Sequence, residues 1–542
     1  MKKNWEYLVI KKDRRNIIIL FLILLFSTFI EMIGIGSIPI FAIIVTEPSQ
    51  LTNYIPFEIK NDSFLNIEKK KLIFFTSLIL LLIFVFKNLI LAFINYFQAF
   101  TIKNLKINIY HNLFKFYINS NYEFHIIQNP STLIRNITSE VGRAANYVLN
   151  LLNLIKEFLI MITIFVLLLF VDLKITLLTF SLLGLFSIIF YLLSKKGAKK
   201  RGKIVQIVWG SIVKAVNQGL GSVKETKILN KENYITDIFD KNINTLEKYN
   251  LHQSFMISLP RIFLEIIAVL TIVIVTILFF VFDRDESTFI PLISLITIAS
   301  LRLIPSFNTI NSSIARMKYL FPAFKLISEE IKKGFEEKKI EKTSEAFMEN
   351  NINSNNQFDF KNKIELREID YFYPNSKIKI IDKLSLQISF GEIIGIIGQS
   401  GAGKSTLIDL IIGLLTPSNG KILIDGKNID LEKQNWQKQI GYIPQEVYLF
   451  DDTIKSNIAF GIPENKINYK NLKEAIKLAE LEEFIQSLPE KENTIIGDRG
   501  TKLSGGQKQR IGIARSLYFK PKILIFDEPT ASIDIKNEEK IM

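Results

Sequence analysis

Four residues between positions 398 and 405 have the types and spacing of a phosphate-binding loop. Gly398, Gly403, Lys404 and Ser405 fit the pattern G-x-x-x-x-G-K-[ST], between two apolar runs. Glycines let backbone N–H groups converge on a phosphate at the start of a helix, where the helix dipole favours anions. The pattern predicts a strand, a glycine loop and a helix. Lys404 would reach the β- and γ-phosphates of a nucleotide, and Ser405 would bind Mg²⁺.

Two adjacent carboxylates near the C-terminus fit the same chemistry. Asp527 and Glu528 follow the apolar run ILIF, which is typical of a buried strand. The first carboxylate can hold Mg²⁺ through water, and the second can act as the general base that polarises the attacking water. The alternative is that the Asp-Glu-Pro sequence merely ends a strand. Lys404 upstream favours the catalytic interpretation.

A third motif, LSGGQKQR at residues 503–510, predicts a second helix start that could bind an anion. A serine hydroxyl and two glycines precede the expected helix. A glycine turn without a ligand is the alternative. The Lys-bearing loop and this separate helix start together suggest that each nucleotide touches both.

The elements that must position these residues differ between the two parts of the chain. Hydrophobic residues make up 48% of the 542 residues. Long Ile/Leu/Phe runs dominate the first 320 residues, whereas residues 322 onward alternate like a soluble α/β domain. There is no cysteine, which excludes disulfides and thiolate sites. The three histidines, His111, His125 and His252, are too scattered to predict a histidine metal cluster.

Six apolar runs are long enough to span a membrane. They cover residues 17–44, 72–97, 147–171, 173–193, 257–282 and 289–310. Basic residues precede the first run and follow the second and fourth, whereas the connection after the fifth is short and acidic. The positive-inside rule therefore predicts that both termini are cytoplasmic. Because the net charge of +14 flanks apolar spans, we expect no nucleic-acid partner.

The three motifs resemble those of the ATP-binding cassette superfamily, and the resemblance covers the whole soluble part. LSGGQ looks like its signature motif, and Gln445 stands where the family's Q-loop glutamine links Mg²⁺ and the attacking water to the membrane domain. Tyr373 matches the aromatic residue that stacks on adenine, and Asp534 matches the D-loop aspartate. Residues 494–500 are similar to the X-loop of exporters. The ATP-contacting residues that the resemblance implies are Tyr373, Gly398, Gln399, Ser400, Gly401, Ala402, Gly403, Lys404, Ser405, Thr406, Ser504, Gly505, Gly506, Gln507 and Asp534.

The resemblance implies an exporter-type half-transporter with ATP and Mg²⁺ as cofactors. We expect an α-helical six-span transmembrane domain at 1–321, a linker at 322–357 and an α/β P-loop nucleotide-binding domain at 358–542. Ser405, Gln445 and Asp527 would hold the metal, and Glu528 and Gln445 would be catalytic. In this family two cassettes sandwich two ATPs, so one cassette per chain implies a homodimer. Coupling helices are expected around 130–140, with Ser131 or Thr132 as N-cap, and around 219–229.

Charged residues inside the predicted spans are candidates for substrate binding, because a charge there costs about 2.5–3.5 kcal/mol on insertion scales. Glu31, Lys87, Arg261 and Arg302 lie in such positions. The structural alternatives remain open. Lys87 and Arg302 could lie in aqueous helix extensions or snorkel, and Arg261 could pair with Glu265 four residues later.

These charged stretches resemble PglK-type flippases, which move polyprenyl-diphosphate-linked oligosaccharides across the bacterial inner membrane for protein N-glycosylation. The resemblance implies such a glycolipid as substrate, with Lys87 and Arg302 facing a cavity and engaging the diphosphate. Two alternatives stay open. One is an exporter of another lipid, a drug or a peptide. The other is a non-hydrolysing cassette regulator or channel, against which Glu528 and the intact LSGGQ argue.

The last residues depart from the superfamily pattern. That pattern continues some thirty residues beyond the D-loop to a switch histidine on a central strand. This chain ends eight residues after Asp534, and its histidines all precede residue 253. We therefore expect a C-terminally incomplete domain, truncated after the D-loop. Exposed strand edges and weak or absent ATP turnover would follow.

Overall fold

A computed structural model describes residues 8–9, 11–46, 69–170, 173–195, 197–281, 289–349 and 359–527 of the chain. The chain divides into two compact units. One comprises Met1–Ser120 and Gln128–Lys342, and the other comprises Asn121–Ile127 and Thr343–Met542. Each unit is described by itself below.

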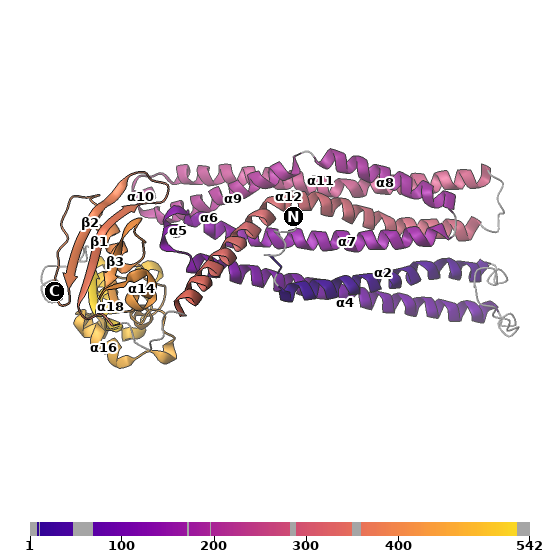
Figure 1. The fold of residues 1–542 in the computed structure, drawn as a ribbon. Helices are drawn as coiled ribbons and strands as arrows, with labels where there is room; N and C mark the ends of the chain where they lie inside the picture. The colour runs from indigo at the N-terminus through magenta and orange to yellow at the C-terminus, as the bar shows by residue number, and fades with distance from the viewer. Residues whose placement is uncertain are drawn as a thin grey trace. The chain divides into compact units, whose positions relative to one another are not determined.

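The first unit is made of helices (Figure 1). Among the described residues they are α2 (Lys11–Thr46), α4 (Lys69–Asn119), α6 (Pro130–Arg135), the π-helical turn η2 (Asn136–Glu140), α7 (Val141–Leu169), α8 (Leu173–Lys195), α9 (Ala198–Gly221), α10 (Val223–Ile228), α11 (Glu232–Val281) and α12 (Phe289–Glu349). Each of the six predicted spans falls in one of these helices, apart from its last residues where a span ends at 171 or 282. Residues 171 and 172, between the third and fourth predicted spans, lie outside the described residues.

Four described helices are long and apolar enough to cross a membrane, by length and composition. They are Asp13–Val45, Lys70–Asn119, Pro130–Leu169 and Glu232–Ile277, and Thr176–Phe190 is a shorter apolar helix. Large apolar side chains of α4, such as Phe74, Leu82 and Phe86, are exposed. So large an exposed apolar surface is stable in lipid and unfavourable in water.

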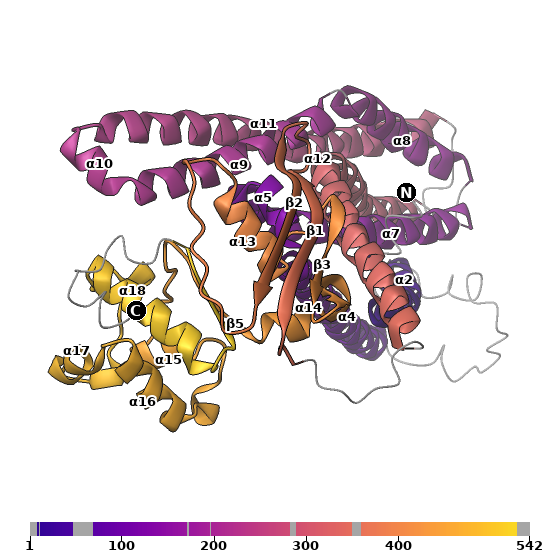
Figure 2. The ribbon, with the colours of Figure 1, turned by 60° about the vertical axis from the view of Figure 1, so that its left-hand side comes forward.

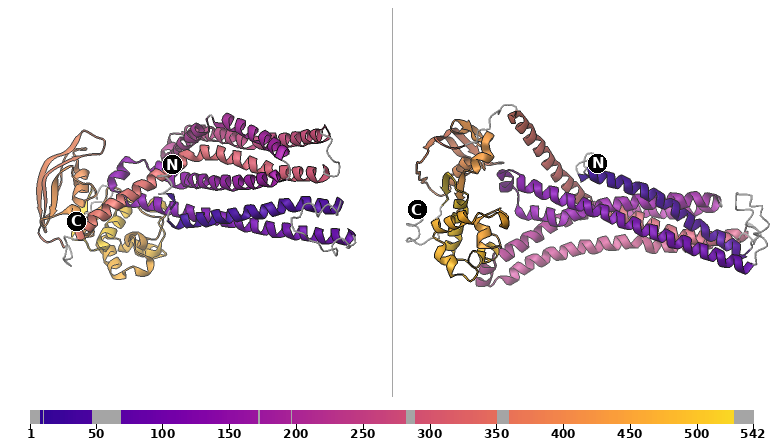
Figure 3. Two further views of the ribbon diagram at one scale, coloured as in Figure 1. Left: turned by 45° about the vertical axis from the view of Figure 1, so that its right-hand side comes forward. Right: turned by 90° about the horizontal axis from the view of Figure 1, so that it is seen from below.

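Interior side chains hold the helical unit together. A buried cluster draws Ile35 from α2, Ile160 from α7, Leu264 from α11 and Leu303 from α12. Helices α2 and α4 run side by side along their length (Figures 1 and 3). At Gly202 of α9, an added Cβ would meet the carbonyl oxygen of Tyr319 in α12 at 2.0 Å. Only glycine allows these two helices to approach so closely.

The second unit contains two separate sheets among its described residues (Figure 2). The first has the order β2-β1-β3-β4 and the second is a parallel pair, β5-β6. The strands are β1 (Lys363–Phe372), β2 (Lys379–Ser389), β3 (Asn419–Ile424), β4 (Lys427–Asn428), β5 (Ile440–Ile443) and β6 (Ile523–Phe526). The helices are α5 (Tyr122–Ile127), α13 (Lys404–Ile412), α14 (Ile429–Gln437), α15 (Ile454–Ile458), α16 (Tyr469–Leu478), α17 (Glu482–Ser487) and α18 (Gly505–Tyr518), with 3₁₀ turns at Glu464–Lys466, Lys491–Asn493 and Asp498–Gly500.

Two hydrophobic cores correspond to two parts of this unit. One lies around Trp436 and Tyr371 and joins the four-stranded sheet to α13 and α14. The other joins α15, α16 and α18 and includes Ile458, Leu472 and Ile511. The indole of Trp436 donates to the carbonyl of Ile411 at 2.7 Å, which satisfies its buried N–H group.

The strand predicted before the glycine loop is wrong. Residues 392–399 form no strand, and Ile393 and Ile397 are 99% and 96% exposed. An apolar run becomes a strand only where neighbouring strands accept its backbone N–H and C=O groups. Neither described sheet includes this segment, so its hydropathy alone was misleading.

The first expected coupling helix differs from the prediction. Residues 130–140 form α6 and η2, which lead directly into α7, and the N-cap is Asn129 rather than Ser131 or Thr132. The Asn129 side chain accepts from the Ser131 N–H at 2.9 Å. A different short helix, α5, belongs to the same compact unit as the cassette. Within 219–229, the expected helix is present as α10.

Candidate functional site

The glycine loop places Lys404 at the first position of α13. Gly401 and Gly403 adopt φ values of +83° and +88°, which favour glycine and turn the chain sharply into the helix. Lys404 Nζ donates to the carbonyls of Gly398 at 2.9 Å and Gln399 at 3.1 Å. The ammonium group therefore lies over its own loop, where a bound phosphate could replace the carbonyls as its partner.

Tyr373 lies beside this helix. Its hydroxyl and the Thr406 hydroxyl are 2.9 Å apart, and Thr406 itself is buried. The Tyr371 ring supports the Tyr373 ring edge-on, with centroids 5.3 Å apart. The structure thus brings together two residues predicted to contact ATP. They are Tyr373, which supplies an aromatic ring, and Thr406, which lies on the phosphate-loop helix.

Asp527 and Gln445 follow adjacent parallel strands. Ile443 of β5 pairs with Phe526 of β6, so the residues after both strands emerge at the same sheet edge. Such edges are the usual ligand sites of parallel sheets. The Tyr442 hydroxyl donates to Asp527 Oδ2 at 3.4 Å. Asp527 comes one residue after the paired Phe526 and Gln445 two residues after the paired Ile443, so both follow neighbouring strand ends.

The donor set predicted for the metal fits Mg²⁺. Hydroxyl, amide and carboxylate oxygens from Ser405, Gln445 and Asp527 are the hard ligands that this ion prefers. In the described part of the chain, no group of three or more His, Cys, Asp or Glu side chains could hold a metal. One carboxylate with neutral oxygens suits an ion that keeps waters and phosphate oxygens as further ligands.

Asp409 is a functional candidate that the motif analysis missed. It lies in α13, and burial together with the nearby Asp527 carboxylate raises its pKa to about 6. Two carboxylates therefore approach each other, one from the phosphate-loop helix and one from β6. The only signal in the sequence is an acidic residue inside the apolar stretch TLIDLII.

The signature motif forms a capped helix start, as predicted. Ser504 is the N-cap of α18 and accepts from the Gln507 N–H at 3.3 Å, while the Gln507 side chain accepts from the Ser504 N–H at 2.9 Å. This reciprocal capping box orders the first turn. Gly505 and Gly506 occupy that turn, so their backbone N–H groups mark an anion-binding helix end.

Arg515 connects α18 to the segment after β5. No motif in the sequence predicted this role. Its guanidinium donates to the carbonyls of Asn457 and Tyr448 at 2.8 and 2.9 Å, and to Asn457 Oδ1 at 3.2 Å. Burial lowers the pKa of Arg515. Gln509 donates to the Pro444 carbonyl at 3.3 Å, one residue before Gln445. Helix α18 and the Gln445 segment therefore form one connected piece.

Helix α5 contacts the cassette through an ionisable pair. The Tyr371 hydroxyl donates to Glu123 Oε1 at 3.4 Å. Burial raises the Tyr371 pKa, and the Glu123 carboxylate adds to this effect. Tyr371 packs against Tyr373, which in turn contacts Thr406 of α13. These two tyrosines therefore link α5 to the phosphate-loop helix.

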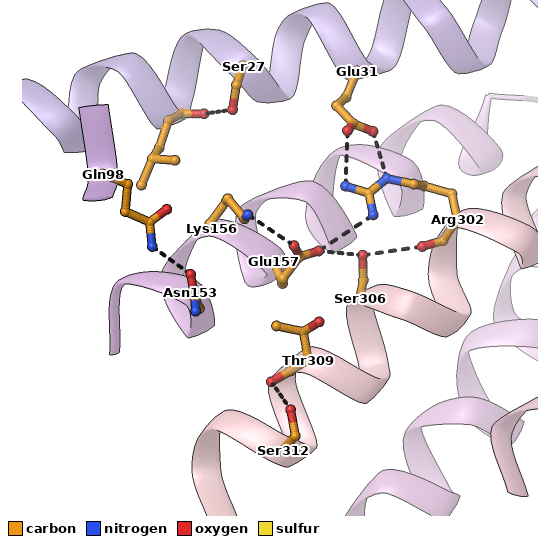
Figure 4. A network of polar contacts seen from close by, with 11 residues as sticks. Ser27, Glu31, Gln98, Asn153, Lys156, Glu157, Arg302, Ser306, Thr309 and Ser312 are labelled. Atoms are coloured by element: carbon orange, nitrogen blue, oxygen red, sulfur yellow. Dashed lines mark hydrogen bonds and ion pairs between the residues drawn. The ribbon is translucent and has the colours of Figure 1, made fainter. Parts of the chain in front are cut away.

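Two of the four intramembrane candidates meet in the helical unit (Figure 4). Arg302 donates to both carboxylate oxygens of Glu31, at 2.7 and 3.0 Å. Glu157 Oε2 lies 3.7 Å from Arg302 Nη1 and accepts from the Ser306 hydroxyl at 2.8 Å. Lys156 lies 3.6 Å from Glu157. The Glu31 side chain is 4% exposed and that of Arg302 is 25% exposed, so the ion pair is largely buried.

Lys87 and Arg261 are placed differently. The Lys87 stem lies against Gly34, one helical turn from Glu31, where a Cβ would come within 2.8 Å of Lys87 Cδ. Its ammonium lies 5.0 Å from the Phe84 ring centroid. Arg261 pairs with Glu265 at 3.0 Å on an exposed surface, as the alternative interpretation anticipated. Glu528 and Asp534 lie outside the described residues.

Comparison with known proteins places the cassette motifs in a family. Residues 381–531 match the family model described as ABC transporter. The chain is 46% identical over 182 residues to a Rickettsia typhi protein provisionally named an export ATP-binding/permease protein, covering 33% of this chain and 31% of that protein. The chain thus matches about a third of the length of this relative.

Two further relatives extend the comparison. YgaD of Bacillus subtilis, provisionally named a multidrug export ATP-binding/permease protein, is 28% identical over 82% of this chain and 75% of its own length. The toxin RTX-I translocation ATP-binding protein of Actinobacillus pleuropneumoniae is 45% identical over 34% of this chain and 26% of its own length.

One solved structure matches nearly the whole chain in fold. A bacterial Atm1-family ABC exporter with ATP bound aligns with a TM-score of 0.74 and 18% identity, covering 97% of this chain and 88% of that one. Residues 381–531 therefore match the ABC transporter family model and follow a helical domain, and the chain has the fold of this solved ABC exporter.

Proposed function

We propose that the chain is half of an ATP-driven exporter of the bacterial inner membrane, with both termini cytoplasmic. The observation that carries this proposal is the phosphate loop with Lys404 at the start of α13, together with Asp527 at the end of β6. Both belong to an ABC transporter domain. ATP hydrolysis would supply the free energy for transport.

Each residue has a distinct part in ATP binding. Lys404 moves from its loop carbonyls to the terminal phosphates, and Tyr373 stacks on adenine. Ser405, Gln445 and Asp527 would hold Mg²⁺, which neutralises phosphate charge when bound. Glu528 orients and deprotonates the attacking water.

The active form is a homodimer. The capped start of α18, with Ser504, Gly505 and Gly506, would face the ATP held by the phosphate loop of a second copy. An anion at this helix end is favoured by the helix dipole and by unpaired N–H groups. The proposal predicts that ATP promotes association of two chains, measurable by cross-linking in detergent.

The proposed substrate is a polyprenyl-diphosphate-linked oligosaccharide. Its support is the pair of cations, Lys87 and Arg302, beside α2 within the predicted spans. Arg302 already engages the Glu31 carboxylate in two-pronged geometry, which matches a diphosphate oxygen pair equally well. A diphosphate would compete with Glu31 for the guanidinium.

The names of the relatives favour a second candidate on the same scaffold. YgaD is named for multidrug export, and the Actinobacillus protein for toxin translocation. An exporter of drugs, other lipids or peptides would need the ATP site equally, but not two cations selected for a diphosphate.

A flipping assay separates these candidates. The full chain is reconstituted in vesicles that contain a short-chain polyprenyl-diphosphate oligosaccharide. Flipping is compared with the ATP turnover of the same sample, because weak turnover is expected for this chain. We expect Lys87→Ala with Arg302→Ala to abolish ATP-dependent flipping and to leave that basal turnover unchanged. Lys248→Ala, at an exposed position of α11, is the control. Unchanged flipping in the double variant excludes the diphosphate role.

A further inference from the structure

Helices α4 and α7 line an open pocket of about 530 Å³ that no motif predicted. The two helices are joined at this level by a hydrogen bond from Gln98 Nε2 to Asn153 Oδ1, 2.6 Å long (Figure 4). Pockets of this volume accommodate small ligands or headgroups. The pocket lies wholly within the helical unit.

Positive charge dominates the lining. Lys103, Lys106 and Lys156 line the pocket, and its described lining includes no carboxylate. Lys103 lies 4.5 Å from the Phe100 ring centroid. In the described ion pairs only Lys156 has an acidic neighbour, Glu157 at 3.6 Å. Three lysines around one cavity repel one another unless an anion joins them.

The remaining polar groups suit a phosphate. Asn95 and Asn146 add side-chain amides, and Tyr110 adds a phenol. Ammonium, amide N–H and phenol O–H groups all donate hydrogen bonds, and phosphate oxygens accept them. A pocket with these donors and without a carboxylate in its lining selects against cations.

The pocket lies at the predicted edge of the bilayer. The second predicted span ends at Phe97 and the third begins at Tyr147, both within the stretches that line the cavity. Immediately before it, α4 exposes Leu89, Phe93 and Tyr96. A headgroup in the pocket would leave its hydrocarbon chain along this apolar surface. Basic pockets between membrane helices on the cytoplasmic side are known to hold lipid headgroups.

We infer that this pocket binds the phosphate-bearing headgroup of an anionic lipid in the cytoplasmic leaflet, in preference to a zwitterionic one. The inference does not depend on which compound the exporter moves. Lysines that merely flank a span would explain the charge, but they would not explain why amide side chains and the Gln98–Asn153 bond lie in the same pocket.

The test uses the natural absence of cysteine. Ile107→Cys places a single thiol in the lining of the pocket, at a position that is 55% exposed. The full chain is reconstituted in phosphatidylcholine vesicles, with or without phosphatidylglycerol or a polyprenyl diphosphate, and the rate of maleimide labelling is measured. We expect about tenfold slower labelling when the free lipid exceeds its dissociation constant by that ratio.

Charge variants show whether the lysines are responsible. Lys103→Gln with Lys106→Gln should weaken lipid binding about thirtyfold, because each lysine near an anionic headgroup contributes about a factor of five. At the same lipid concentration, the roughly tenfold protection should then almost disappear. Lys103→Arg with Lys106→Arg keeps the charge and should keep the protection, which separates charge from misfolding. Ile118→Cys, 64% exposed on the same helix, should label at one rate throughout.

The two lipids identify the source of the headgroup. Protection by the polyprenyl diphosphate alone assigns the pocket to a transported lipid, and protection by phosphatidylglycerol assigns it to a membrane phospholipid. Equal labelling with and without both lipids overturns the inference. Protection that survives the glutamine variants overturns it as well.

Discussion

Arg302 and Glu31 lie 271 residues apart in sequence and form a bidentate ion pair between two helices, with N–O distances of 2.7 and 3.0 Å. The pair joins α12 to α2 inside the helical unit, with Glu157 of α7 as a second acidic neighbour. Three helices thus meet at one charged centre within an otherwise apolar region.

Glu31→Gln should destabilise the helical unit by about 3 kcal/mol, because it leaves a guanidinium that is mostly buried without its main partner. Replacing both partners, Glu31→Met with Arg302→Met, should cost less than the single change. Thermal unfolding in detergent measures both. Glu329→Gln, which breaks the exposed Lys325–Glu329 pair, should cost less than about 1 kcal/mol. A double variant less stable than Glu31→Gln would contradict this account.

Asp409→Asn should stabilise the nucleotide-free protein above pH 6 and have little effect near pH 4. The pKa of Asp409 is raised from 3.8 to about 6 in the folded chain. A carboxyl group whose pKa is higher in the folded than in the unfolded chain stabilises the fold fully at pH values below its pKa in the unfolded chain. That contribution is lost as the pH rises through its pKa in the folded chain. Asparagine cannot ionise, so the variant avoids the loss.

The measurement is the unfolding temperature of the full chain as a function of pH, with nucleotide and magnesium removed. The buried Trp436 provides an intrinsic fluorescence signal in the same unit. Asp430→Asn, in α14, is the control carboxylate. Parallel pH curves for the parent chain and Asp409→Asn would show that folding does not raise the pKa of Asp409.

Arg515→Gln should destabilise the cassette by about 3 kcal/mol, because it removes charged hydrogen bonds to buried Asn457 and to the Tyr448 carbonyl. It should also weaken ATP-dependent association, since α18 would keep the Gln509–Pro444 bond to the Gln445 segment but lose the bond to Tyr448. Arg510→Gln on the same helix loses one exposed bond to the Glu480 carbonyl and serves as the control. Equal unfolding temperatures for the two variants would refute this role.

Tyr373→Phe should bind ATP nearly as well as the parent chain, whereas Tyr373→Ala should bind about tenfold more weakly. Phenylalanine keeps the ring that stacks on adenine and loses only the 2.9 Å contact with Thr406. A stacked aromatic ring contributes about 1–3 kcal/mol to base binding. Binding of a fluorescent ATP analogue to the full chain tests this. A loss with phenylalanine as large as with alanine would assign the role to the hydroxyl.

Local pattern predicted much of this fold and site. The phosphate loop, the helix after Ser504 and the strand before Asp527 are set by residues close in sequence, so spacing was enough to find them. Six apolar runs located six helices for the same reason.

The errors concern partners distant in sequence. Residues 392–399 have the hydropathy of a strand but no pairing partner among the described strands. Arg515 and Asp409 gain their roles from contacts with Asn457 and Asp527, which no local pattern encodes. Helix α5 was missed because its six residues have no recognisable periodicity.

The contact between Glu123 and Tyr371 predicts how α5 affects transport. Tyr371→Phe removes a single hydrogen bond of 3.4 Å, so it should weaken the contact by about 1 kcal/mol and leave ATP binding intact. Because α5 follows α4 in the chain, a weaker contact should lower the amount of substrate moved per ATP hydrolysed. Glu123→Ala combined with Tyr371→Phe should be no worse than either change alone, since both remove the same bond. Tyr469→Phe, an exposed tyrosine of α16, should change nothing. Additive losses in the double variant would mean that the two residues act separately.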